Sequence, residues 1–283
     1  MTRAAAFFDL DKTIIAKSST LAFGRPFFHG GLINRRAVLK TAYAQLVFSL
    51  AGADAQQMER LRAQLTTMVT GWDAATVQDI VQETLHDIVD PLVYAEAADL
   101  IEEHRAAGRE IVIVSSSGAE IVEPIGEMLG VDRVVATRMV VVDGRYTGEM
   151  DFYAYGEHKA EAMRAVAAEG GYDLADCYAY SDSVTDLPML SAVGHPTAVN
   201  PDRGLRKAAL ENGWPVLQFT RPVSMRVRFS APPTPVVTGA AMGVGAAVVG
   251  LAWYARHRAL RSVSPSTPGL PAPVTGRRRR RGA

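Results

Sequence analysis

Cysteine is nearly absent from this chain of 283 residues, which contains one, Cys177. A single cysteine excludes an intramolecular disulfide and a zinc site built from several thiolates. Cys177 opens an apolar run that continues through Tyr180. Because cysteine is among the residues most often buried, we expect this thiol to lie in the core without a chemical role.

The N-terminus lacks the long apolar run of a secretory signal peptide. Phe7 and Phe8 are followed at once by Asp9, Asp11 and Lys12, which interrupt any hydrophobic segment of the required length. We therefore expect the main part of the chain, including any catalytic domain, to stay in the cytoplasm.

A surplus of charge is also missing, because 30 basic residues balance 30 acidic ones. We therefore expect no nucleic acid partner for the molecule as a whole. From Thr220 onward, however, the chain has no aspartate or glutamate while arginines accumulate. With 48% hydrophobic residues, a chain of this length suits one core with an inserted or appended unit.

Apolar runs that alternate with helical patterns predict a parallel β-sheet. The expected strands are Ala4 to Leu10, Ile111 to Val114, Cys177 to Tyr180, Thr197 to Val199 and Pro215 to Phe219. Strands that are apolar on both faces and separated by helices are typical of a sheet covered by helices on both sides. The predicted fold class is α/β, with a Rossmann-like core.

A long helical block, residues 18–86, interrupts this order. From 39 to 50 its apolar residues recur every three or four positions, the spacing of one helix face. We therefore predict an inserted helical cap at 17–87. The core then consists of residues 1–16 and 88–220.

Local signals predict further elements of the core. Asp90-Pro91 is expected to begin a helix that runs to Ala107, with aspartate as the N-cap and proline in the first turn. Asp143-Gly144 predicts the turn of a β-hairpin. Other helices are expected at Glu120 to Leu129, at Glu157 to Glu169 and just after Asp186.

Polar residues follow the first three core strands. Asp9 and Asp11 end the first, Ser115 follows the second, and Asp182 follows the third. Because ligands of open α/β sheets bind at the carboxyl ends of the strands, we expect these side chains to share one site.

The two neighbouring aspartates suit phosphoryl transfer. One carboxylate can attack phosphorus, while the other donates a proton to the departing oxygen and later activates water. Mg²⁺ prefers oxygen ligands, which Asp9, Asp182 and the main-chain carbonyl of Asp11 can supply. Asp186, four residues after Asp182, is suited to support the metal's ligands, directly or through water.

Phosphate needs ligands of its own. Ser115 and the main-chain N–H groups of Ser116 and Ser117 are expected to open a helix, whose N-terminus favours an anion. Lys159 lies at the start of another predicted helix. Its charge can offset that of the nucleophile and the phosphate, which would otherwise repel each other.

At these positions the chain resembles the haloacid dehalogenase (HAD) superfamily of phosphatases. Its four motifs match, in order, Phe8–Thr13, Val114-Ser115, Lys159 and Ser181–Asp186. The helical block resembles the cap of the phosphoserine-phosphatase-like branch (subfamily IB).

The resemblance implies a role for each matched residue. It implies Asp9 as nucleophile and Asp11 as general acid and base. It also implies Ser115 and Lys159 as phosphate ligands, and Asp9, Asp11 and Asp182 as ligands of Mg²⁺.

Two positions depart from the family pattern. Relatives that act on phosphoserine carry a glutamate a few residues after the first motif, where it meets the substrate amine. The matching place here is about Ser18, and no acidic residue lies between Asp11 and Asp54, which argues against phosphoserine as the substrate. The fourth motif opens with Ser181 instead of the usual glycine, a change that we expect to be tolerated.

The C-terminal part contains an uncharged segment of 27 residues, 229–255. This segment is long enough to cross a membrane, and we predict a transmembrane helix and membrane association; a loosely associated or soluble apolar tail is the alternative. Residues 256–283 are predicted to be a disordered, arginine-rich tail. The orientation of the segment stays open, as does binding of the arginines to anionic lipid or nucleic acid.

We predict a magnesium-dependent phosphomonoester phosphatase that acts on a small phosphorylated metabolite through a phospho-aspartyl intermediate on Asp9. Two alternatives remain open. One is a phosphotransferase of the same fold that passes the phosphoryl group to an alcohol. The other is a membrane-tethered regulator that binds a phosphorylated ligand.

Overall fold

The computed structural model describes residues 3–33, 63 and 66–222 of the chain. They belong to the first of two compact units, Met1–Ala231. The second unit, Pro232–Ala283, lies outside the described residues.

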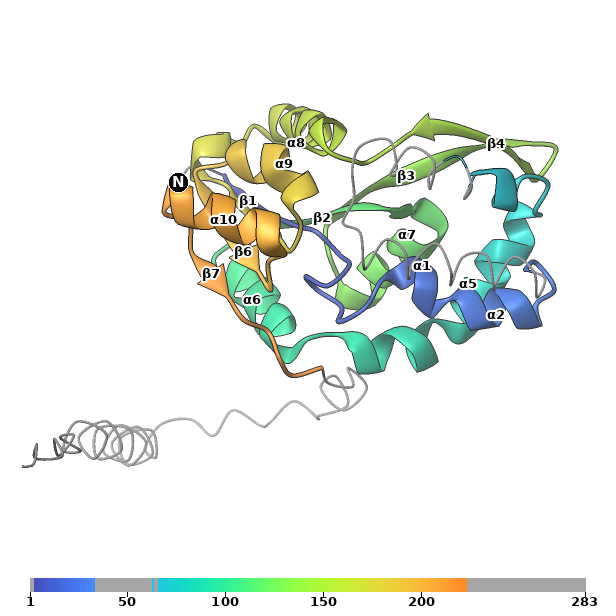
Figure 1. The fold of residues 1–283 in the computed structure, drawn as a ribbon. Helices are drawn as coiled ribbons and strands as arrows, with labels where there is room; N and C mark the ends of the chain where they lie inside the picture. Colours follow the sequence, from blue (N-terminus) through green and yellow to red (C-terminus); the bar gives the residue numbers. More distant parts are fainter. Residues whose placement is uncertain (1–2, 34–62, 64–65, 223–283) are drawn as a thin grey trace, which may run out of the picture. The chain divides into compact units, whose positions relative to one another are not determined.

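Within these residues, the strands form one sheet in the order β4-β3-β2-β1-β5-β6-β7 (Figure 1). The strands are β1 Ala5–Phe8, β2 Glu110–Gly118, β3 Arg133–Val142, β4 Arg145–Phe152, β5 Tyr178–Ser181, β6 His195–Val199 and β7 Val216–Leu217. All neighbouring pairs are parallel except β3 and β4, which are antiparallel. The predicted α/β fold with a parallel, Rossmann-like sheet is therefore confirmed.

Helices connect these strands. They are α1 Ser19–Ala22, α2 Gly24–His29, α5 Ala74–Val89, α6 Ala95–Ala106, α7 Ala119–Leu129, α8 Glu157–Gly170, α9 Leu187–Ser191 and α10 Arg203–Asn212, with short 3₁₀ turns η1 Asp90–Leu92, η2 Leu174–Asp176 and η3 Val184–Asp186.

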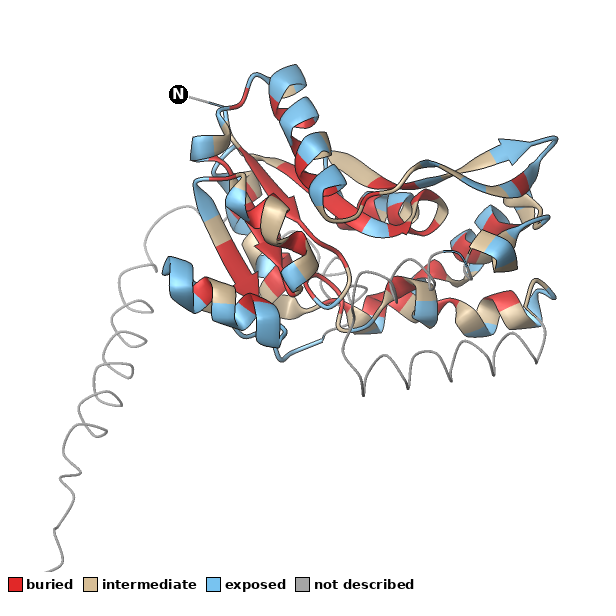
Figure 2. Cartoon of the chain, turned by 45° about the horizontal axis from the view of Figure 1, so that its top comes forward, coloured by how far each residue is buried: buried red, intermediate tan, exposed pale blue. Residues whose placement is uncertain are grey.

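The side chains of β1 alternate between two hydrophobic clusters, one on each face of the sheet. Ala6 and Phe8 belong to the cluster that includes α5, α6 and α7. Ala5 and Phe7 belong to the cluster that includes α8, α9 and α10. Figure 2 shows the resulting pattern, with buried residues along the central strands and exposed ones on the outer faces of the helices. This alternation is what a period of two residues produces in a doubly covered sheet.

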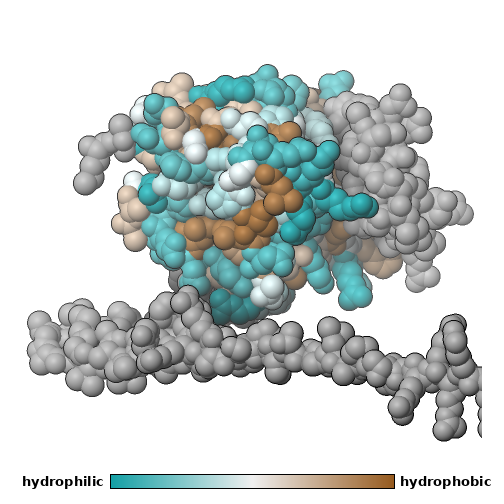
Figure 3. Space-filling model, turned by 60° about the vertical axis from the view of Figure 1, so that its left-hand side comes forward, coloured by the Kyte–Doolittle hydropathy of each residue, from teal (hydrophilic) through white to brown (hydrophobic). Residues whose placement is uncertain are grey.

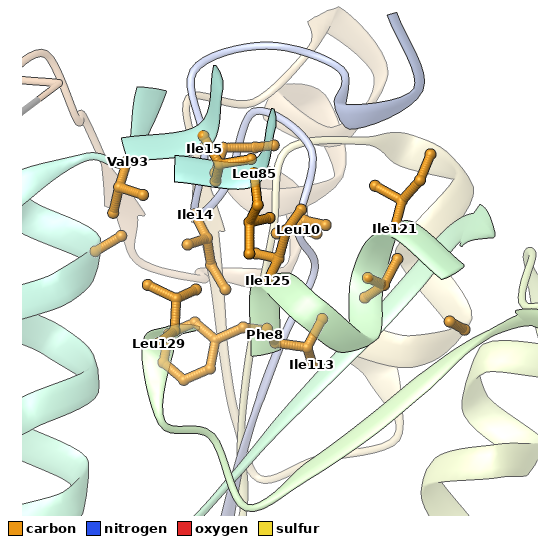
Figure 4. Packing of buried hydrophobic residues seen from close by; sticks show 14 of the residues in the cluster. Phe8, Leu10, Ile14, Ile15, Leu85, Val93, Ile113, Ile121, Ile125 and Leu129 are labelled. Carbon is orange, nitrogen blue, oxygen red and sulfur yellow. The ribbon is translucent and has the colours of Figure 1, made fainter. Parts of the chain in front are cut away.

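The first cluster also contains residues from the described ends of the predicted cap. Buried residues of α2 and α5, such as Phe27 and Val81, pack in the same cluster as Phe8 of the sheet. Figure 4 shows the centre of this cluster, where Phe8, Ile113 and Leu129 lie close together. Residues 34–62 and 64–65 of the predicted cap are outside the described residues, and its boundaries stay a prediction.

A short segment before α5 bonds to the β3–β4 hairpin through three main-chain hydrogen bonds, which we call the insert–hairpin contact. The N–H of Gly71 donates to the carbonyl of Tyr146 over 2.8 Å, and that of Ala74 donates to Gly144 over 2.9 Å. The N–H of Tyr146 donates back to Trp72 over 3.1 Å. The insert is thereby attached to the core away from its two chain connections.

The predicted hairpin is confirmed, with Asp143 and Gly144 both at positive φ, 49° and 73°. These angles suit a tight hairpin turn. The strands predicted to flank this turn are Arg138 to Val142 and Arg145 to Glu149. The first of them is longer in the structure, because β3 begins at Arg133 and also pairs in parallel with β2.

The predicted helix start at Asp90 is wrong. Asp90 caps the end of α5 and begins the 3₁₀ turn η1, and α6 begins only at Ala95. Val93 is extended and forms an antiparallel bridge with Ile15. This bridge keeps the backbone extended at Val93, where the helix was predicted.

No helix among the described residues combines the length and apolar character that crossing a membrane requires. The segment predicted to span a membrane, 229–255, and the predicted disordered tail, 256–283, both lie outside those residues. On the face that comes forward in Figure 3, hydrophilic residues surround separate hydrophobic areas.

Candidate active site

Three neighbouring strands bring the predicted site residues together. In the sheet β1 lies between β2 and β5, so Asp9 after β1, Ser115 near the end of β2 and Asp182 after β5 lie at the same edge. All three are nearly buried, with exposures of 6%, 1% and 7%. The N–H of Asp9 donates to the carbonyl of Tyr180 over 2.9 Å, which extends the sheet pairing to the aspartate itself.

Lys159 reaches this edge from the first turn of α8. Its side chain has an exposure of 2%, and its Nζ donates to Asp9 Oδ1 over 2.7 Å and to Asp186 Oδ2 over 2.8 Å. Burial alone would lower the pKa of Lys159, but Asp186 and Asp9 together raise it above its ordinary value. The ammonium group is therefore held charged between two carboxylates.

Asp186 lies at the end of η3 and is buried. Besides Lys159, its Oδ2 accepts a hydrogen bond of 2.7 Å from the hydroxyl of Ser181. Ser181, which departs from the family pattern, thus helps to fix the carboxylate of Asp186, which in turn binds Lys159. Sequence reasoning assigned no such role to Ser181.

The carboxylate of Asp11 turns toward a group of hydroxyls. Its Oδ1 accepts from the N–H of Ser19 over 2.8 Å, and its Oδ2 accepts from the Ser117 hydroxyl over 3.2 Å. The Ser19 hydroxyl in turn donates to Ser117 over 2.8 Å. Both serines are buried, and neither hydroxyl was predicted to contact the acid.

The prediction that Ser115, Ser116 and Ser117 open a helix is wrong. β2 continues to Gly118, which pairs with Thr137 of β3, and α7 begins at Ala119. The register shifts between Ser115 and Gly118, so these serines form an irregular strand end. The Ser115 hydroxyl is buried and accepts from the N–H of Ser117 over 3.2 Å, whereas Ser116 is exposed.

Asp182 follows β5, and so lies on the opposite side of Asp9 from Ser115 of β2. Its carboxylate lies 3.8 Å from Nζ of Lys12, which is largely exposed. Its main-chain carbonyl accepts from the N–H of Asp202 over 2.8 Å. Asp202 also caps α10 through Leu205, so the start of that helix is fixed to the Asp182 loop.

Buried carboxyl groups outnumber buried ammonium groups inside the site. Burial raises the pKa of Asp9 to about 8, with Lys159 opposing and Asp186, Asp182 and Asp11 adding to the rise. Burial likewise raises the pKa of Asp182 to about 7, against the influence of Lys12. Three buried aspartates therefore face one buried lysine.

The residues present fit a hard divalent cation. In the described part of the chain, no group of three or more His, Cys, Asp or Glu side chains is arranged to hold a metal ion. Asp9 and Asp182 would thus need additional oxygens from the main chain or from water, which is the usual ligand set of Mg²⁺. The surplus of buried carboxylate is the charge that such an ion would balance.

Two surface depressions contain none of these residues. One, of about 450 Å³, lies on α10 around Arg206, and the other, of about 280 Å³, lies around Arg109.

Comparison with known proteins places this arrangement in a family. The model of the haloacid dehalogenase-like hydrolases matches residues 6–191. A Streptomyces azureus protein named "Inhibition of morphological differentiation protein" is 64% identical over 91% of this chain and 95% of its own. A Mycobacterium tuberculosis protein named as a probable phosphatase is 63% identical over 90% of each chain. A phosphoserine phosphatase of the same species is 32% identical over 87% of this chain and 80% of its own.

Solved structures share the fold. A protein of unknown function from Bordetella pertussis Tohama I has a TM-score of 0.68 at 28% identity, over 77% of this chain and 99% of its own. A phospho-aspartyl intermediate analogue of phosphoserine phosphatase has a TM-score of 0.56 at 18% identity, over 81% and 99%. At that identity the second likeness concerns the fold alone. The chain belongs to the haloacid dehalogenase-like hydrolase family, in its phosphoserine-phosphatase-like branch, and is a phosphoric monoester hydrolase.

Proposed function

We propose that this phosphatase hydrolyses a small phosphorylated metabolite through a covalent phosphate on Asp9, with Mg²⁺ as its cofactor. The observation that carries the proposal is the buried ammonium of Lys159, held between Asp9 Oδ1 and Asp186 Oδ2 at 2.7 and 2.8 Å. A carboxylate attacks a phosphate ester only when positive charge offsets the repulsion between the two anions. Lys159 supplies that charge beside the proposed nucleophile.

In the proposed reaction, an oxygen of Asp9 attacks phosphorus and the ester P–O bond breaks. Asp11 donates a proton to the departing oxygen, which leaves as an alcohol. Asp11 then takes a proton from water, which attacks the phosphorus of the aspartyl phosphate, and the P–O bond to Asp9 breaks. Phosphate is released and both aspartates return to their first state.

Ser115 and the neighbouring Ser116 are proposed to bind the phosphate oxygens together with Lys159. Asp9, Asp182 and the main chain of Asp11 are proposed to hold Mg²⁺. When bound, the ion supplies positive charge to the phosphate oxygens.

The proposed substrate is not phosphoserine, although one relative is named a phosphoserine phosphatase and another a histidinol-phosphatase. An amino-acid substrate needs a carboxylate near its ammonium group. At the matching place this chain has Ser18, Ser19 and Thr20, and the hydroxyls of Ser19 and Thr20 contact Ser117. Hydroxyls at this position favour a phosphate ester without a charged amine.

The decisive variant is Asp9→Asn, assayed on the full chain with p-nitrophenyl phosphate and Mg²⁺. We expect turnover below about a thousandth of the wild-type rate, because an amide does not attack phosphorus. Asp176→Asn is the matched control, since Asp176 is exposed at the opposite end of β5, and it should keep full activity. Retained activity in Asp9→Asn would exclude the mechanism, and activity that survives EDTA would exclude the cofactor.

Product analysis with an added alcohol separates hydrolysis from the phosphotransferase alternative. Magnesium-dependent turnover of any phosphate ester would exclude the ligand-binding regulator. The cytoplasmic location and the membrane association through residues 229–255 stay predictions.

A further inference from the structure

A chain of hydroxyls ends on the proposed acid. The Ser19 hydroxyl donates to Ser117 Oγ, and the Ser117 hydroxyl donates to Asp11 Oδ2. Thr20 Oγ1 lies 3.2 Å from the same Ser117 oxygen. The residues come from two distant parts of the chain, because Ser19 and Thr20 belong to α1 of the insert and Ser117 belongs to β2 of the sheet.

Asp11 is thereby held by two anchors on its two carboxylate oxygens. The N–H of Ser19 holds Oδ1 and the Ser117 hydroxyl holds Oδ2. One hydrogen bond leaves the carboxylate plane free to rotate, whereas two bonds from different segments fix it. A proton donor contributes fully only when it is fixed toward the atom that receives the proton.

We propose that Ser117 is a positioning residue that orients Asp11 for proton transfer to the leaving group. This inference rests on the proposed function, since it takes Asp11 as the acid. Ser117 is suited to the role because it is buried in the sheet at the register shift of β2, and its own N–H is bonded to Ser115 Oγ over 3.2 Å. The serine therefore has little freedom of its own.

The role can be separated from a general structural one by the leaving group. Phenolate leaving from phenyl phosphate benefits from a proton, whereas the acidic phenol of 2,4-dinitrophenyl phosphate leaves without one. A misaligned Asp11 should therefore slow only the first substrate. A loss of folding or of phosphate binding should slow both equally.

The experiment compares kcat/KM of Ser117→Ala and wild-type full-length protein on these two substrates with Mg²⁺. For Ser117→Ala we expect kcat/KM to fall about ten- to a hundredfold on phenyl phosphate. On 2,4-dinitrophenyl phosphate we expect kcat/KM to fall less than about threefold, which is within the factor of about ten that a single hydrogen bond contributes. Ser117→Thr, which restores a hydroxyl, should recover most of the loss. Ser191→Ala, at an exposed serine that ends α9, should leave both values unchanged.

Equal loss on both substrates, or no loss on either, overturns the positioning role. If Ser117→Ala does not fold, Ser19→Ala tests the same chain one step away, and it should show the same selectivity with a smaller amplitude. Asp11→Asn distinguishes the two levels of the proposal. If Asp11→Asn loses no more kcat/KM on phenyl phosphate than on the dinitrophenyl ester, the proposed role of Asp11 fails. If Asp11→Asn loses more on phenyl phosphate but neither serine variant does, only the proposed role of Ser117 fails.

Discussion

Among the side chains of the site, Lys159 combines a positive charge with an exposure of 2%. Its two carboxylate partners come from the ends of β1 and η3, so one side chain on α8 connects three elements. Removing one partner of a buried ion pair is costly, because the other charge then stays unpaired in a medium of low polarity.

Replacing this lysine by methionine tests that account. Lys159→Met should lower kcat/KM at least about a hundredfold, as loss of an electrostatic stabiliser does. It should also lower the free energy of unfolding by about 3 to 5 kcal/mol, measured by urea denaturation at neutral pH. Lys207→Met is the control, since that lysine is 77% exposed. A variant as stable and active as wild type would contradict the account.

At this scale, sequence reasoning found the acids and Lys159 but not the hydroxyls that hold them. Asp9 and Asp182 were found because each follows a predicted strand, which the apolar pattern locates. Lys159 was found through its place in the order of the family motifs. Ser117 and Ser181 act through hydrogen bonds whose partners depend on side-chain direction. No spacing in the sequence encodes that direction.

At the scale of elements, close backbone contacts determine how connections between strands pack. Gly194, between α9 and β6, is an example. A Cβ at this position would lie 1.8 Å from the main-chain carbonyl oxygen of Ala175, in η2. The N–H of Gly194 also donates to the carbonyl of Leu174 over 2.9 Å.

We therefore expect Gly194→Ala to lower the unfolding free energy by about 2 kcal/mol or more, since overpacking against backbone typically costs about 1 to 3 kcal/mol. Thermal unfolding measures the effect. The matched variant is Gly24→Ala, where a Cβ would meet nothing within 4 Å. It lies in α2 and should be neutral or slightly stabilising. Equal effects of the two substitutions would contradict the packing argument.

The sequence prediction at this scale omits α10 altogether. Its signals are present: Asp202 caps the helix, Leu205 and Ala209 are four residues apart and buried, and Gly213 ends it in the left-handed conformation. The helix is otherwise strongly polar, so its weak apolar stripe does not stand out. β3 was underestimated for a related reason, since its parallel part lies next to the hairpin that dominates the local pattern.

At the scale of the whole molecule, His104 of α6 contacts both β1 and β5 on one face of the sheet. Its Nε2 lies 2.9 Å from the Tyr180 hydroxyl, and its ring meets Phe8 edge-on. Arg109 lies 3.2 Å from Nδ1. Burial, with Arg109 assisting, lowers the pKa of His104 from 6.5 to about 4.

This shift predicts acid sensitivity. Between pH 6.5 and about 4, His104 is protonated in the unfolded chain but neutral in the folded chain. The contribution of His104 to the unfolding free energy is therefore fully present above pH 6.5 and falls as the pH is lowered toward 4. The loss from this residue is at most about 3 kcal/mol. The unfolding free energies of wild type and His104→Gln are measured against pH. As the pH falls from 6.5 to about 4, the wild-type value should fall by up to that amount relative to the value of the variant. His29→Gln, at an exposed histidine, should run parallel to wild type, and parallel curves for His104→Gln would contradict the prediction.

The layered architecture follows from the sequence, but the sharing of one hydrophobic cluster by core and insert does not. Apolar runs reveal that a strand is buried on both faces. They do not reveal which helix covers a face, because Val81 of α5 and Ile125 of α7 are equally apolar. That choice depends on the path of the chain through the insert.

The insert–hairpin contact has a mechanical consequence for the molecule. Two covalent connections define an axis about which an inserted segment can rotate as a rigid body. The three main-chain hydrogen bonds between residues 71–74 and 144–146 add a constraint away from that axis. Any rotation of α5 must therefore either bend the two-stranded ribbon of β3 and β4 or break these three hydrogen bonds.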